Sequence, residues 1–238
     1  MVQPAAGAEV LDMTTIDQIL TGKVAPLCLK AVPSGIDKYP VTGRVFLGRE
    51  GLTGDAQGDR KHHGGPDKAL HHYAFEHYAH WIDVIGPRDV LVRPGAFGEN
   101  LSTRGLTENE AAIGDIFRIG QAVVQVSQGR QPCWKLNARF DVPDMALQVQ
   151  RTGLTGWYYR VIEEGFIEVG DALALEDRVS PEWTIRRAWR TLYVDTMNLG
   201  ELAEMASLAH LPDSWRGYAR KRLETRQVEN WSRRLQGT

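Results

Sequence analysis

The pattern of apolar residues changes near residue 178, and this change limits the folds that the chain can adopt. Before it, short apolar runs alternate with glycine-containing turns. Residues 113–119 and 122–126 are two such runs joined by Gly120 and Gln121, which predicts a β-hairpin. Many short strands with turns between them favour a barrel or a sandwich over a doubly wound sheet.

Other runs extend this strand-rich region. Residues 41–47 are typical of a strand, and residues 169–175 repeat the Gly-Asp punctuation of the first hairpin. Residues 157–162 and 166–169 are joined by two glutamates and a glycine, so we expect a second hairpin there.

Two helices are expected to interrupt the strands. The first has one apolar face, which consists of Phe75, Tyr78, Ile82 and Ile85. His77 and His80 fall off that face, which predicts that both contact solvent. The second covers residues 142–150, where an acidic residue and Pro143 indicate a helix start.

After residue 178 the pattern is helical throughout, with three apolar stripes that begin at Ile185, Leu199 and Trp215. We therefore expect a mainly β fold with inserted helices, a barrel domain over residues 1–178 and a three-helix bundle over residues 179–238. From Arg178 onward there are 11 Lys and Arg and 7 Asp and Glu, a net of +4 in a chain whose net charge is −2. This asymmetry supports a separate C-terminal module.

Composition excludes several classes of protein. No apolar run approaches the ~20 residues of a membrane helix, and the first residues do not resemble a signal peptide. Cys28 and Cys133 lie far apart, which argues against a disulfide framework and suggests the cytoplasm. Cys28 sits in an apolar strand-like run, so we interpret it as structural. The overall charge does not indicate a nucleic-acid or membrane partner.

Cys133 lies in the segment Gly-Arg-Gln-Pro-Cys-Trp-Lys over residues 129–135. The segment follows an apolar strand pattern, so we expect the thiol on a loop at a strand end. Arg130 and Lys135 would stabilise a thiolate, the form that attacks substrates and binds metals. Pro132 restricts the backbone on its N-terminal side and would stiffen the loop. A buried cysteine that packs as a small apolar residue is the alternative.

A histidine-rich loop covers residues 60–73 and contains His-Gly-Gly-Pro-Asp-Lys from His63 to Lys68. Glycines let the backbone approach a ligand, and the cations of the loop suit phosphate. A zinc site built from His63, His72 and Cys133 is the alternative, although the spacing matches no common zinc motif. A third loop, residues 93–102, offers Asn100 as a hydrogen-bonding group for a ring edge, or as part of a turn.

Taken in this order, the segments 63–70, 97–101 and 130–135 resemble the signature of MOSC-domain proteins. The C-terminal helices resemble the YiiM-like subfamily, which carries an appended three-helix domain. The resemblance implies a β-barrel that binds a pterin molybdenum cofactor (molybdopterin), with Cys133 as the metal ligand. It further implies cofactor-side roles for His63, Lys68, Asn100 and Arg130, and a weaker match extends this to Lys23. Lys135 would offset the cofactor's charge.

The implied activity is the reduction of N-hydroxylated compounds, such as hydroxylaminopurine-like bases and hydroxylamines, to amines. His63 or His72 would act as the acid, and electrons would come from a separate flavin-type reductase. The alternative is a molybdenum cofactor or sulfur carrier with a persulfide on Cys133. The C-terminal helices are suited to binding the reductase or forming a homodimer. A solvated face explains the arginines and lysine at positions 216–226 better than a nucleic-acid contact does.

Overall fold

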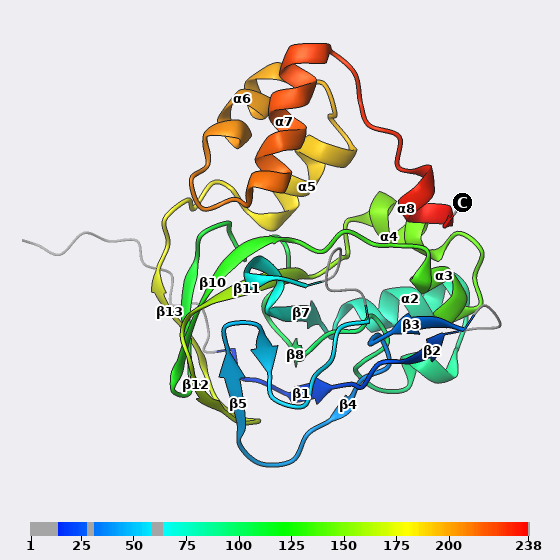
Figure 1. Cartoon of the computed structure of the whole chain (residues 1–238), viewed down its shortest axis with the longest axis vertical. Coiled ribbons are helices and arrows are strands. Elements are labelled where there is room, and N and C mark those ends of the chain that lie inside the picture. Colours follow the sequence, from blue (N-terminus) through cyan, green and yellow to red (C-terminus); the bar gives the residue numbers. More distant parts are fainter. Residues whose placement is uncertain (1–13, 28–30, 59–63, 238) are drawn as a thin grey trace, which may run out of the picture.

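The computed structural model of the chain describes residues 14–27, 31–58 and 64–237 (Figure 1). Its largest sheet has eight strands, in the order β13-β9-β10-β11-β7-β8-β1-β4, and curls into an open barrel. These strands are β1 (Gln18–Thr21), β4 (Tyr39–Pro40), β7 (Leu70–Ala74), β8 (Leu101–Thr103), β9 (Ile116–Ile119), β10 (Ala122–Gly129), β11 (Trp157–Glu163) and β13 (Leu173–Asp177). Neighbouring strands are antiparallel, except that β7 and β8 run parallel. The expectation of a mainly β barrel with helices is confirmed.

Two small sheets accompany the barrel. One consists of β5 (Val45–Gly48), β6 (Gly51–Leu52) and β12 (Gly165–Ile167), and the other of β2 (Ala25–Leu27) and β3 (Val32–Ser34). The predicted hairpin of β9 and β10 is confirmed, with Ala122 opposite Ile119.

The second predicted hairpin is wrong, because β12 pairs with β5 and not with β11. Gly165, the first residue of β12, passes close to the turn between β9 and β10, since a Cβ there would lie 2.6 Å from the Gln121 carbonyl carbon. Phe166 then lies opposite Phe46, with ring centroids 5.3 Å apart.

The helices of the barrel region are short. They are η1 (Pro66–Lys68), α2 (His77–Ile85), η2 (Asp89–Leu91), α3 (Lys135–Phe140) and α4 (Met145–Thr152). The predicted face of α2 needs correction, because Ile82 is 39 % exposed and Trp81 is fully buried. The Trp81 indole nitrogen donates to the Tyr73 hydroxyl at 2.7 Å, which keeps the larger ring inside.

His77 is also buried, contrary to expectation, whereas His80 is exposed. The His77 Nε2 atom lies 2.7 Å from a carboxylate oxygen of Glu108, which accounts for a histidine in the interior.

The C-terminal region consists of α5 (Ile185–Tyr193), α6 (Leu199–Ser207), α7 (Asp213–Thr225) and α8 (Ser232–Gln236). The first predicted stripe is confirmed, since Ile185, Trp189 and Leu192 are all buried. Helices α5, α6 and α7 gather above the barrel, whereas α8 returns beside α3 and α4 (Figure 1).

Two apolar clusters hold these parts together. The larger fills the barrel and continues to the inner faces of α5, α6 and α7. The smaller lies around α2 and α3, where the Phe97 ring stacks on Tyr73 at 4.2 Å and lies 4.9 Å from Phe140. Among the described residues, no helix is both long and apolar enough to cross a bilayer.

Candidate functional site

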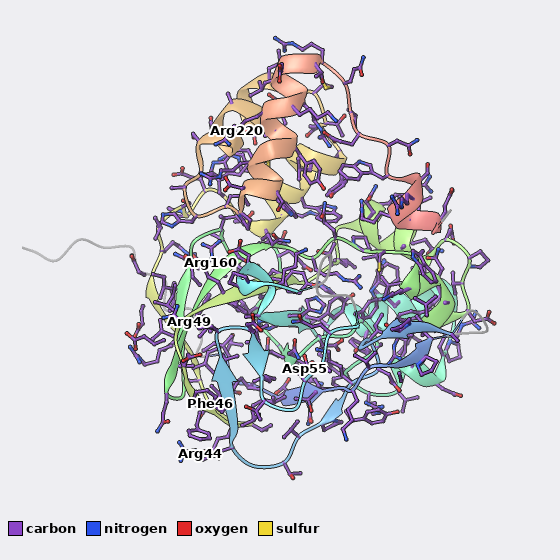
Figure 2. The ribbon with its side chains drawn as sticks, in the orientation of Figure 1. Arg44, Phe46, Arg49, Asp55, Arg160 and Arg220 are labelled. Atoms are coloured by element: carbon purple, nitrogen blue, oxygen red, sulfur yellow. The ribbon has the colours of Figure 1, made fainter. Side chains whose placement is uncertain are left out.

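A cavity of about 80 Å³ lies where β7, β10 and β11 meet the loops after β3 and β6. Cys133 lies in its wall, and the charged residues around it are Lys38, Asp55, Lys68, Arg130 and Lys135. Four cations and one carboxylate give a formal charge of +3 (4 − 1). Figure 2 labels Asp55 within the barrel region. A cavity of this charge is suited to an anionic ligand.

Cys133 lies on the loop between β10 and α3, at the strand end where the sequence predicts it. The Arg130 backbone nitrogen donates to the Gly156 carbonyl at 3.0 Å, so the loop leaves the sheet directly beside β11. The Cys133 carbonyl accepts from the Leu136 nitrogen at 2.9 Å, which begins the turn into α3. Cys133 is 8 % exposed, and its accessible face borders the cavity.

Arg130 offers the cavity a buried hydrogen-bond donor. The side chain borders the cavity and is 6 % exposed. Its Nη1 atom is buried and has no hydrogen-bond partner within the described part of the chain. Because a buried donor without a partner costs free energy, an anionic group that fills the cavity would satisfy it.

Lys68 is the last residue of the short helix η1, which is bonded to strands β10 and β11 of the barrel. The Ser127 hydroxyl donates to the Asp67 carbonyl at 2.6 Å, and the Asp67 carboxylate pairs with Arg160 at 2.7 Å. Lys68 and Cys133 therefore border the same cavity although they lie far apart in the sequence. His63 and Cys28 lie outside the described residues.

Asn100 borders the cavity, but its side chain is engaged within the protein. The Nδ2 atom donates to the Leu20 carbonyl at 3.1 Å and to Asp55 at 2.8 Å, and Oδ1 accepts from the His71 backbone nitrogen at 3.1 Å. Asn100 thus fixes Asp55 and joins the loop before β8 to β7 and β1. The structure shows it as a positioning group and leaves at most one lone pair of Oδ1 for a ligand.

The segment before Asn100 forms a built turn. The Glu99 carboxylate accepts hydrogen bonds from the Gly95 nitrogen at 2.6 Å and the Phe97 nitrogen at 3.0 Å. Gly95 has a φ of 108°, and a Cβ there would lie 2.7 Å from the Lys38 carbonyl oxygen. Glycine at position 95 is therefore required by the turn beside the cavity wall.

The two remaining predicted lysines differ in position. Lys135 is buried beside the cavity, and its Nζ atom donates to the Pro33 carbonyl at 2.9 Å. Lys23 is exposed after β1 and does not line the cavity. The structure therefore brings Lys135 together with Cys133 but leaves Lys23 apart.

His72 does not line the cavity, so its expected role as the acid or as a zinc ligand is wrong. Its Nε2 atom contacts the Thr103 hydroxyl at 2.7 Å and its Nδ1 atom contacts the Tyr159 hydroxyl at 2.9 Å. Burial lowers the pKa of His72 to about 3. Because successive residues of a strand face opposite sides, His71 faces the cavity instead.

His71 and Tyr158 are cavity residues that the sequence interpretation missed. Their rings lie 5.1 Å apart. Burial, and then the charges of Arg130 and Lys38, hold the pKa of His71 well below its usual range, so it is neutral. Burial raises the pKa of Tyr158, so its hydroxyl keeps its proton. Strand alternation over residues 70–74 was the signal that could have identified His71.

Lys38 and Asp55 were also missed, and no sequence motif marks them. Lys38 lies just before β4, which pairs with β1, and Asp55 follows β6 and accepts a hydrogen bond from the Gly22 nitrogen just after β1. Burial lowers the pKa of Lys38, and the neighbouring Asp55 carboxylate opposes that shift.

Two family models match this chain. The MOSC domain matches residues 59–174, and the YiiM-like 3-alpha helix domain matches residues 183–226. With the barrel and the relatives described next, these matches show that the chain belongs to the MOSC-domain family, in its YiiM-like branch.

The chain is 42 % identical to Protein YiiM of Escherichia coli over 219 residues, which are 92 % of this chain and 97 % of that protein. The crystal structure of YiiM from Escherichia coli matches with a TM-score of 0.79 and 38 % identity, covering 94 % of this chain and 98 % of that one. A protein of Gibberella moniliformis named Reductase is 34 % identical over 210 residues, 87 % of this chain and 37 % of that protein.

Proposed function

We propose that this chain binds a molybdenum–pterin cofactor in the cationic cavity, with Cys133 as the metal ligand. We further propose that it reduces N-hydroxylated compounds, hydroxylaminopurine-like bases and hydroxylamines among them, to amines. One observation carries the proposal. A thiol and four cations border one cavity, and Arg130 presents there a buried guanidinium nitrogen with no partner among the described residues. Membership of the MOSC family and the likeness to a protein named Reductase support it.

The residues fit such a cofactor by charge and by donor type. A pterin phosphate and a dithiolene are anionic, and the cavity lining has a formal charge of +3 (4 − 1). A thiolate is a soft ligand suited to a metal that is also bound by sulfur. Arg130 would hold an anionic group of the cofactor through the Nη1 atom that now has no partner among the described residues.

The reaction requires two electrons and two protons: R–NHOH + 2e⁻ + 2H⁺ gives R–NH₂ + H₂O. The N–O bond breaks, and the hydroxyl leaves as water. The bound molybdenum would supply the electron pair, because no side chain does so reversibly. A separate flavin-type reductase would then return the electrons.

The side chains of the cavity have three tasks in this scheme. Lys38, Lys68 and Arg130 balance negative charge. Tyr158 keeps its proton because burial raises its pKa, so it can donate a hydrogen bond to the substrate oxygen. His71 is neutral and can accept or donate one hydrogen bond without adding charge. The role of His63 as the acid stays a prediction, as does a cytoplasmic location.

The rival proposal, a sulfur or cofactor carrier, needs a cysteine that a partner protein can reach. Cys133 is 8 % exposed and lies in a cavity wall, which favours a small ligand over sulfur transfer between proteins. A nucleic-acid role for the basic residues of α7 is also disfavoured. Arg222 is buried in an ion pair with Glu229 at 2.7 Å, and Figure 2 shows Arg220 on the helical region, far from Asp55.

The proposal is tested on protein from a molybdenum-replete host. We expect stoichiometric molybdenum and pterin, and turnover of hydroxylamines when a reductase is added. Cys133→Ser should lose both metal and turnover while it keeps the melting temperature of the cofactor-free parent, and Cys28→Ser should keep metal and turnover. Full turnover by Cys133→Ser would refute the assignment. Labile sulfane sulfur without turnover would support the carrier.

A further inference from the structure

The C-terminal segment, residues 231–237, lies against the loop that carries Cys133. It contains α8 and follows an extended stretch that leads back from α7 to the barrel (Figure 1). This segment begins after residue 226, where the match to the YiiM-like 3-alpha helix domain ends. It contributes no residue to the cavity lining.

One residue of this segment holds the backbone on both sides of Cys133. The Arg234 guanidinium donates through Nη1 to the carbonyl oxygen of Pro132. The Arg234 carbonyl accepts from the backbone nitrogen of Trp134 at 2.8 Å. Arg234 therefore brackets the cysteine, with one bond immediately before it and one immediately after.

Arg234 is itself fixed in place. Its Nη2 atom donates to the Gln150 side chain on α4 at 2.5 Å, and its guanidinium lies over the rings of Trp231 and Tyr193 at 4.9 and 5.5 Å. Planar stacking and a forked donor set are properties of arginine that lysine lacks. Burial lowers the pKa of Arg234, although arginine stays charged at neutral pH.

Neighbouring contacts join the same two segments. The Asn137 side chain donates to the Leu235 carbonyl at 2.9 Å, and the Gln131 side chain donates to the Tyr193 hydroxyl on α5. Gln131, Pro132 and Trp134 are therefore all bonded to the C-terminal helical region. The loop is held from its outer side, while its inner side borders the cavity.

We propose that Arg234 is a positioning residue for Cys133, and that residues 231–237 act as a strap that keeps the thiol at the cavity wall. Without the Arg234 side chain, the loop would open more often and the thiol would reach solvent more often. Only the further expectation, that the same variant retains less molybdenum, rests on the proposed function.

The test uses the full-length chain from a host grown without molybdenum, so that no bound metal shields the thiol, and measures the rate at which iodoacetamide alkylates Cys133 under native conditions. Peptide mass spectrometry separates this rate from that of Cys28. We expect Arg234→Ala to react about tenfold faster than the parent, because the loop loses the bond to the Pro132 carbonyl and the C-terminal segment loses the bond to Gln150 that fixes it on α4. The alkylation rate of Arg234→Lys should lie between those of the parent and Arg234→Ala, since lysine keeps the positive charge but lacks the forked donor set of arginine.

Arg233→Ala is the matched control, because Arg233 is an exposed arginine on the same helix. Its rate should stay within about twofold of the parent. A parental rate for Arg234→Ala, or an equal rise in Arg233→Ala, would overturn the proposal. If Arg234→Ala fails to fold, Gln150→Ala removes the second anchor alone, and its rate must rise by about threefold. If Arg234→Ala is alkylated faster but the chain never contains molybdenum, even from a molybdenum-replete host, the positioning role of Arg234 is supported and the proposed function is refuted.

Discussion

The Nζ atom of Lys38 lies 2.6 Å from Oδ2 of Asp55, and both side chains are almost fully buried, at 8 % and 6 % exposed. The same carboxylate accepts hydrogen bonds from Asn100 and from the Gly22 backbone nitrogen. The pair and its partners therefore join four separate segments beside the cavity. Its position also explains why a cationic cavity contains one carboxylate.

Asp55→Ala should destabilise the fold strongly, because it leaves the Lys38 ammonium buried without its counter-charge. Breaking a buried ion pair in this way costs about 3–5 kcal/mol of the free energy of unfolding. Urea unfolding measures the change. Asp17→Ala is the control, since its pair with Arg104 is exposed and contributes about 0–1 kcal/mol. Equal effects of the two substitutions would contradict the assignment.

Arg130→Ala should weaken cofactor retention more than it changes stability. The Nη1 atom of Arg130 has no partner among the described residues, so its removal breaks no bond at that atom. We expect a loss of less than about 1.5 kcal/mol in the free energy of unfolding, and clear loss of molybdenum and pterin on gel filtration. Lys23→Ala, an exposed control, should retain the cofactor. Equal occupancy in Arg130→Ala and the parent would count against the role.

Stability of the cofactor-free protein should fall as pH drops below about 6.5, because of His71 and His72. Burial lowers the pKa of both from the usual 6.5, to about 3 for His72. The unfolded chain then binds protons that the native chain does not, so acid favours unfolding. Each histidine contributes a slope of about 1.4 kcal/mol per pH unit.

Urea unfolding at pH 7, 6 and 5 gives this slope directly. His72→Gln should reduce the slope of stability against pH by the contribution of one histidine, about 1.4 kcal/mol per pH unit. This reduction does not depend on how the substitution changes stability at pH 7. A slope that is the same in the parent and in His72→Gln would show that His72 is protonated in the native state.

Local pattern was enough to predict some parts of this molecule. The hairpin of β9 and β10 depends on residues that are neighbours in sequence, and so does the placement of Cys133 just after the strand. The face of α2 was mistaken because Trp81 and Ile82 are adjacent and both are apolar. Only packing against Tyr73 decides which of the two points inward.

The rest depends on contacts between distant segments. Lys38 and Asp55 meet at the end of β1, where β4 pairs with β1 and the Gly22 nitrogen donates to Asp55, and β12 pairs with β5, which lies far from it in the sequence. No local periodicity contains that information. Alternation along β7 does distinguish His71 from His72, so His71 could have been predicted from the sequence as a cavity residue.

Gly129, the last residue of β10, has a further consequence. A Cβ at this position would lie 3.1 Å from the Trp215 ring of α7, so the strand that leads to the thiol is fitted to the helical region above it. The helical region therefore cannot be exchanged without regard to the strand that it contacts. A chimera that takes this bundle from a distant relative would also need that relative's residues 129–134.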